Sequence, residues 1–264
     1  MKKYTASITL NKNSRGCYIL DTVKGCSVCK IEKPNGCYGE CYAKKIASRY
    51  NYDFGNPTVR DFNNDNQMSL FSFRDSKHIR EIIRKIKKAN MPFIRIGEMG
   101  DPSENWEHTI NICNVVSETK KPIVIITKHW KEIDNNLLRN LEQLNICINT
   151  SISAIDTEKE IEYRLMQYNK LKNHCNSVLR IVSCDFNKEN IIGSKMSIMQ
   201  EMLFENVKTI DTVFRPSKDN ELVKNNIINV EKVQFLKKEM LVSLHNKKSY
   251  LGYCNNCPDM CGIF

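Results

Sequence analysis

The loop over residues 25–43 constrains this chain more than any other feature, because it holds four of the twelve cysteines. Cys26 and Cys29 form a CxxC pair, and Cys37 and Cys41 form a CxxxC pair within the sequence GCSVCKIEKPNGCYGECYA. A glycine directly precedes the first cysteine of each pair, which allows the backbone to turn tightly. The residues after Cys41 begin a helical pattern, so we expect this thiol at a helix N-terminus. Without secretory features, so dense a group of thiols predicts a metal site rather than a disulfide framework.

The length and net charge of the chain indicate its number of domains, its location in the cell and the kind of partner it binds. A chain of 264 residues can bury a sizeable core, and no Pro-, Gly- or Ser-rich linker divides it, so we expect one domain. We find neither a signal peptide nor an apolar stretch able to cross a bilayer, which predicts a cytoplasmic protein without membrane contact. The net charge of +10 favours a polyanionic partner such as nucleic acid. A compositional bias of an AT-rich genome explains the charge equally well.

Short apolar segments rich in β-branched residues alternate with amphipathic helical patterns. The predicted strands span residues 16–23, 92–97, 122–127, 145–152, 177–184 and 209–214. The predicted helices span residues 76–89, 106–119, 134–144, 157–171 and 194–206, and a capping box of Thr157 and Glu160 opens the fourth. This alternation predicts an α/β fold with a parallel sheet covered by helices. Six units favour an open (βα)6 partial barrel over a closed eight-stranded one.

The remaining segments complete the prediction. We expect an edge strand over residues 4–10 and a loop over residues 51–73. Val233, Leu236, Met240 and Leu244 share the spacing of one helix face, which predicts a final helix after residue 230. The barrel then covers residues 1–229, and residues 230–264 hold the helix and a cysteine-rich segment.

Polar residues follow the predicted strands where chemistry gathers in such folds, at their carboxyl ends. Gly97 and Glu98 follow the second strand, and Lys128, His129 and Trp130 follow the third. Ser151 and Ser153 end the fourth strand, and Arg180 lies within the fifth. A buried charge requires a partner, so Arg180 is predicted to point into the site toward a carboxylate or phosphate.

The cysteine loop after the first strand, the six βα units and the sequence Ile96-Gly97-Glu98 together resemble the radical SAM superfamily. In that family three cysteines hold a [4Fe–4S] cluster, and its fourth iron binds S-adenosylmethionine (SAM). The GC…GCxxxCYA pattern is also similar to phage-associated radical-SAM-like families. The resemblance implies an enzyme that reductively cleaves SAM to a 5′-deoxyadenosyl radical. We expect a nucleic-acid or nucleotide substrate and an electron-donor protein as partners.

The chain departs from the usual CxxxCxxC triad of that family, because Lys44 stands in the third position. The resemblance implies that Cys26 joins Cys37 and Cys41 as the missing ligand. The other implied SAM contacts are Tyr42 near the adenine, Gly97 and Glu98 at the amino group, Arg180 at the carboxylate, and Ser151 and Ser153 at the sugar or carboxylate. If Cys29 also bound the same metal, no position would remain for SAM, and the centre would be structural zinc or an electron-transfer cluster.

A second group of thiols, Cys254, Cys257 and Cys261, lies near the C-terminus. Under the assignment above, these three require a fourth ligand, for which we expect Cys29 and consider Cys17 as the alternative. The resemblance implies an auxiliary iron–sulfur cluster here, with zinc as the alternative. The other cysteines are interpreted as small buried hydrophobic residues: Cys113, Cys147, Cys175 and Cys184. A rival interpretation makes both groups structural, in a zinc- or iron–sulfur-stabilised nucleic-acid-binding protein without SAM chemistry.

Overall fold

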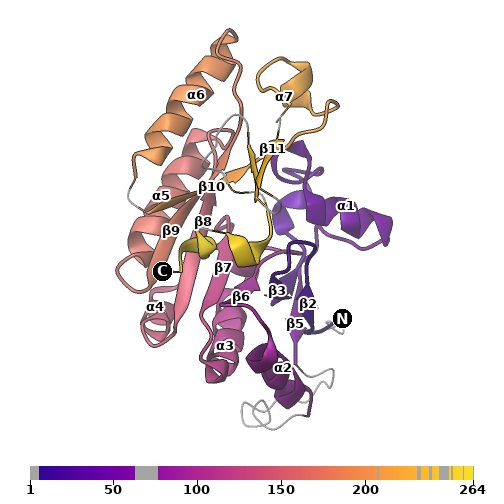
Figure 1. Cartoon of the computed structure of the whole chain (residues 1–264), viewed down its shortest axis with the longest axis vertical. Coiled ribbons are helices and arrows are strands. Elements are labelled where there is room, and N and C mark those ends of the chain that lie inside the picture. The colour runs from indigo at the N-terminus through magenta and orange to yellow at the C-terminus, as the bar shows by residue number, and fades with distance from the viewer. Residues whose placement is uncertain are drawn as a thin grey trace.

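The computed structural model describes residues 6–62, 77–206, 208–230, 233–237, 240–243, 250, 252–257 and 259–263. A mostly parallel sheet of seven strands forms the centre of this α/β fold (Figure 1). From edge to edge its strands are β10 (Thr209–Val213), β9 (Asn176–Ser183), β8 (Ile146–Ile152), β7 (Ile123–Thr127), β6 (Ile94–Ile96), β3 (Tyr18–Leu20) and β2 (Leu10–Lys12). Only β2 runs antiparallel to its neighbour. The six parallel strands are the six predicted from the sequence.

Seven α-helices lie within the described residues. They are α1 (Tyr42–Arg49), α2 (Lys77–Lys88), α3 (Trp106–Val116), α4 (Asn135–Leu141), α5 (Glu158–Leu171), α6 (Ile191–Phe204) and α7 (Glu221–Lys224). The predicted capping box at α5 is confirmed, with both reciprocal hydrogen bonds between Thr157 and Glu160. Helix α6 begins earlier than expected, because the Asn190 side chain accepts hydrogen bonds from the first free backbone N–H groups.

The two faces of the sheet are covered differently. On one face, isoleucines of β6, β7 and β8 pack against α2, α3 and α4 in the main core. On the other face, Phe93, Val124, Cys147 and Val178 pack against the C-terminal segment at Cys254. Figure 1 shows that segment, in yellow, crossing the sheet, and it contacts β8 and β9. A sheet buried on both faces explains why its strands are continuously apolar.

A smaller sheet corrects part of the loop predicted over residues 51–73. It pairs β1 (Ala6–Ser7), β5 (Thr58–Asp61) and β4 (Val23–Lys24), so the loop prediction is wrong for β5. The rest of the loop from residue 63 lies outside the described residues. The β-branched residues Thr58 and Val59 pair with β4, and the next two residues of β5 pair with β1.

The helix predicted after residue 230 is also wrong. The chain instead forms an antiparallel pair of strands, β11 (Val233–Lys237) and β12 (Met240–Ser243). Over so short a stretch the spacing of the apolar residues fits both the period of a helix and that of a strand. The backbone pairing between the two segments makes them strands. Within the described residues, none of the helices combines the length and the apolar character needed to span a bilayer.

Candidate metal and cofactor site

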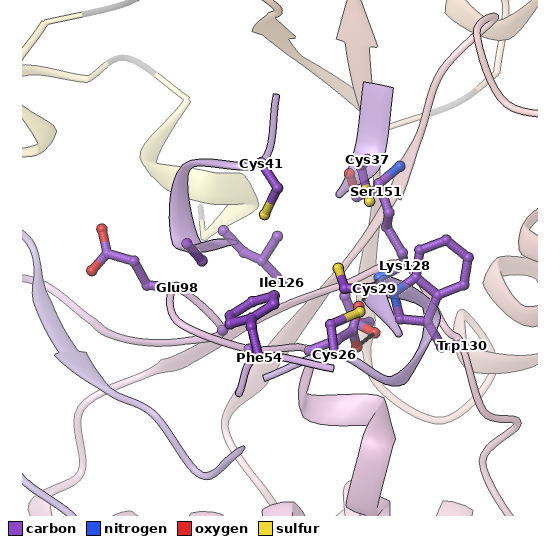
Figure 2. Close-up of a pocket in the computed structure, with 15 residues that line it drawn as sticks. Cys26, Cys29, Cys37, Cys41, Phe54, Glu98, Ile126, Lys128, Trp130 and Ser151 are labelled. Atoms are coloured by element: carbon purple, nitrogen blue, oxygen red, sulfur yellow. Dashed lines mark hydrogen bonds between the residues drawn. The ribbon is translucent and has the colours of Figure 1, made fainter. Parts of the chain in front are cut away.

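The four cysteines of the loop, Cys26, Cys29, Cys37 and Cys41, line a single cavity of about 210 Å³ (Figure 2). The cavity lies at the carboxyl ends of β6, β7 and β8, as expected for a parallel sheet. These strands and the turns after them contribute Gly97, Glu98, Ile126, Thr127, Lys128 and Ser151 to its walls. The structure therefore brings the loop and the strand-end residues together.

The backbone of the loop positions the thiols through two 3₁₀ turns, at Ser27–Cys29 and Cys37–Gly39. Gly36 precedes the second turn with φ of 80°, and a Cβ built there would lie 1.9 Å from the Cβ of Cys41. Glycine is thus required for Cys41 to reach the cavity. Cys41 occupies the N-cap position of α1, which confirms the predicted location at a helix N-terminus.

The thiols of this cavity titrate in a buried environment. Burial raises the pKa of Cys37 to about 11, against the opposing effect of the Lys128 ammonium. A hydrogen bond between the two thiols raises the pKa of Cys26 and lowers that of Cys29. Burial also raises the pKa of Cys41, although backbone N–H groups at the start of α1 favour its thiolate. A metal that binds these thiols must displace protons from them, so metal loading depends on pH.

Three acidic residues that were not predicted as site residues hold the walls of the cavity in place. Glu104 accepts hydrogen bonds from the backbone N–H and the hydroxyl of Ser27, both at 2.7 Å. Asp101 accepts from the backbone N–H of Lys128 at 2.8 Å, and Asp21 accepts from that of Glu98 at 2.8 Å. Asp21 directly follows β3, so its position at a strand end was the available signal. These carboxylates are structural, because each accepts from fixed backbone groups.

Glu98 lies on the side of the cavity opposite Lys128 and Trp130, and its carboxylate points away from Cys26 and Cys29 (Figure 2). The carboxylate accepts a hydrogen bond of 3.2 Å from the uncharged Asn13 amide. It can therefore still accept a cationic ligand. Tyr42 is 60% exposed and does not line the cavity. Its partial burial, with a smaller effect of the Glu98 charge, raises its pKa.

A buried charged cluster joins the cysteine loop to the sheet. Asp156, which follows β8, forms an ion pair with Arg164 of α5 and lies 3.5 Å from the Lys128 ammonium. Tyr38 of the cysteine loop donates a hydrogen bond of 3.2 Å to Asp156. Burial opposes ionisation of this carboxyl, yet Lys128 and Arg164 outweigh it and hold the pKa of Asp156 below its usual value. One carboxylate thus anchors the loop, the end of β7 and α5 together.

Three predicted contacts of a SAM molecule do not line this cavity: Tyr42, Ser153 and Arg180. Ser153 is fully buried, and its hydroxyl donates to the carbonyl of Val182 at 2.7 Å, so it stabilises the backbone. Arg180 donates to Asn149 and Thr212 and lines a different cavity beneath the C-terminal segment. Its position in the middle of β9, away from the strand end, explains the error. Ser151 does line the first cavity, as predicted.

The fourth partner predicted for the C-terminal cysteines is also different. Cys254, Cys257 and Cys261 line the cavity of Arg180 together with Cys17, whereas Cys29 lines the first cavity. A single 3₁₀ turn separates Cys29 from Cys26, and a hydrogen bond from Ser27 to Glu104 fixes that turn. Cys29 therefore stays beside Cys26 in the first cavity. Cys17, considered as the alternative, lines the cavity of the C-terminal group. The thiol of Cys147 also contacts this group, since it donates to the carbonyl of Cys261 at 3.4 Å.

Among the described residues, no three His, Cys, Asp or Glu side chains form a metal-binding group as they stand. No protein-family model matches the chain, and no curated protein sequence matches it.

His129 lies behind the cavity and is fully buried, so it does not contact a ligand there. Its Nε2 is 3.0 Å from the Thr150 hydroxyl, and its ring packs against Trp106 at 5.5 Å. Burial, with a smaller effect of the Arg164 charge, lowers the pKa of His129 to about 3. The imidazole is neutral in the folded protein at physiological pH.

This burial predicts a loss of stability in acid. In the unfolded chain the imidazole takes up a proton near its usual pKa of about 6.5, whereas the folded chain resists protonation down to about 3. Stability is therefore lost as the pH falls through this window. We expect about 2–3 kcal/mol less stability at pH 4.5 than at pH 7 from this residue. Urea unfolding of His129→Gln should show a smaller fall in the free energy of unfolding between pH 7 and pH 4.5. The surface control His174→Gln should show the same fall as the unaltered protein. An identical pH dependence in His129→Gln would assign the loss to other groups.

Proposed function

We propose that this protein is an iron–sulfur enzyme of the radical SAM type, built on a (βα)6 partial barrel. Cys26, Cys37 and Cys41 would hold a [4Fe–4S] cluster in the cavity of Figure 2. The observation that carries the proposal is that these thiols line one cavity with Gly97 and Glu98 at the carboxyl ends of a parallel sheet. The cavity volume, about 210 Å³, suits a polynuclear cofactor with a ligand beside it better than a single ion.

When bound, such a cluster supplies the electron that cleaves SAM to methionine and a 5′-deoxyadenosyl radical. The protein contributes binding, orientation and exclusion of water. Phe54, Ile126 and Trp130 provide apolar walls that keep water from a reactive intermediate. The net charge of +10 supports a nucleic-acid or nucleotide substrate, and the reduction calls for an electron-donor protein.

Gly97 and Glu98 have distinct proposed roles. Gly97 has φ of 96°, and a Cβ built there would lie 2.4 Å from the carbonyl oxygen of Ile126. Glycine therefore lets the turn after β6 pass close to β7 and leaves the backbone open to a ligand. The Glu98 carboxylate would hold the ammonium group of SAM by a charge-assisted hydrogen bond. Ser151, in the cavity wall, would contact the sugar or carboxylate, and Tyr42, which does not line the cavity, would contact the adenine.

One observation favours a second candidate. Cys29 lines the same cavity as the other three thiols, and a metal held by all four has no open position. The protein would then be a SAM-independent redox protein or a metal-stabilised binding protein. Binding of SAM separates the two candidates, because only an open cluster takes it as a ligand.

SAM binding by anaerobically reconstituted protein is therefore the deciding experiment, with Glu98→Gln as the informative variant. The glutamine keeps the shape and a hydrogen-bond acceptor but removes the charge. Loss of a charge-assisted hydrogen bond costs about 1.5–3 kcal/mol, so we expect about ten- to a hundredfold weaker binding by calorimetry. Fold and iron content should not change.

Glu107→Gln is the matched control, since Glu107 is exposed on α3 and lies outside the cavity. It should bind SAM as the unaltered protein does. If Glu98→Gln also binds SAM normally, Glu98 is an ordinary loop acid. If the unaltered protein carries iron and sulfide but binds no SAM, the closed centre replaces the radical SAM proposal.

A further inference from the structure

The second group of cysteines lines a cavity of its own, between the C-terminal segment and strands β6, β9 and β10. Cys17, Cys254, Cys257 and Cys261 line a cavity of about 50 Å³. Cys17 immediately precedes β3, and the other three belong to the C-terminal segment. Cys17 and Cys254 are both buried and belong to the same packed cluster. Four thiols from the two ends of the chain thus meet at one place.

Hydrogen bonds hold the C-terminal segment against the sheet at this place. The backbone N–H of Cys254 donates to the carbonyl of Arg15 at 2.8 Å, and the Arg15 Nε donates back to Gly252 at 2.8 Å. The Asn149 amide donates to the carbonyl of Cys261 at 2.9 Å. The three C-terminal cysteines are therefore positioned by the fold rather than carried on a free tail.

When the four cysteines are protonated, the charged side chains that line this cavity carry a net positive charge. Three arginines, Arg15, Arg95 and Arg180, line it, against the two carboxyl groups of Asp211 and Asp259. The Nε of Arg95 is buried and has no hydrogen-bond partner. Three arginines against two carboxylates leave an excess of one positive charge, which favours thiolates over thiols at this site.

We propose that Cys17, Cys254, Cys257 and Cys261 form a closed four-thiolate zinc centre that ties the C-terminal segment to the start of the sheet. Binding of Zn²⁺ releases four thiol protons, and all four coordination positions are then occupied by protein. The cavity offers four thiols, which is the number of ligands that a structural zinc ion takes. The site is structural, and it does not rest on the radical SAM proposal.

The test uses a chain in which Cys26, Cys37 and Cys41 are replaced by serine, so that the first cavity cannot retain metal. Purified with zinc, this chain is expected to keep about one zinc per molecule by elemental analysis. Adding Cys17→Ser should remove that zinc. Adding Cys29→Ser should not, and neither should Cys113→Ser, which removes an equally buried thiol within α3. Zinc that survives Cys17→Ser, or that is lost equally with Cys29→Ser, overturns the proposal.

A second measurement on the unaltered chain covers the case in which the variants do not fold. Alkylation of the folded protein, mapped by mass spectrometry, should spare Cys17, Cys254, Cys257 and Cys261 as a set. A zinc chelator should expose all four together. A Cys17–Cys254 disulfide, independent reactivity of the four thiols, or iron with sulfide in place of zinc at this site overturns the assignment.

Discussion

Replacing Cys41 by alanine is expected to remove the proposed iron–sulfur cluster from the first cavity and to abolish the proposed cleavage of SAM. Cys26→Ala and Cys37→Ala should have the same effect, since a [4Fe–4S] cluster is held through its thiolate ligands. The unaltered protein, purified without oxygen, should be brown and contain iron and acid-labile sulfide. Iron, sulfide and 5′-deoxyadenosine are measured for each variant. Cys29→Ala is expected to retain the cluster and the SAM chemistry.

Cys175→Ala is the matched control, because Cys175 is half-buried and lies outside the two cysteine cavities. The ligand assignment is reversed if Cys29→Ala removes the cluster and Cys26→Ala does not. Loss of the metal in all four single variants, with no SAM chemistry in the unaltered protein, indicates a closed centre. Colourless protein with stoichiometric zinc and no sulfide in the first cavity contradicts the radical SAM proposal.

Asp156→Ala is expected to be the most destabilising single change in the cluster that anchors the cysteine loop. The Arg164 side chain is 1% exposed and that of Asp156 is fully buried, so the variant leaves a buried guanidinium and the Lys128 ammonium without their shared carboxylate. Breaking a buried ion pair in this way costs about 3–5 kcal/mol. Urea unfolding at pH 7 measures the loss. The cysteine loop should also loosen, because Tyr38 loses its partner.

An exposed ion pair is the natural control for this effect. Glu142→Ala removes the partner of His174 on the surface and should cost about 1 kcal/mol or less. Asp156→Ala combined with Arg164→Met should be more stable than the sum of the two single changes predicts, because the buried guanidinium that has lost the Asp156 carboxylate is then absent. Strict additivity of the two changes contradicts the assigned coupling.

The strands and helices around the site could be predicted because their sequences agree with their structures locally. The strand β7 begins with four consecutive β-branched apolar residues. So short an apolar run is typical of a strand that is buried on both faces of a parallel sheet. Helix α5 carries its own start signal in Thr157 and Glu160. The order and parallel direction of six strands follow from this alternation. The segment of β11 and β12 lacked such a signal, since its apolar spacing fits either period.

The sequence by itself determined that thiols gather in two groups, and it determined that the first lies at the carboxyl ends of the strands. Both follow from spacing along the chain. Only the tertiary structure decided that Cys17, rather than Cys29, joins Cys254 and its neighbours, and that Arg180 lies in their cavity. Only the fold decided that Asp21, Asp101 and Glu104 support the first cavity. Such partners are far apart in sequence, and they meet because the pairing of strands and the docking of the C-terminal segment bring them together.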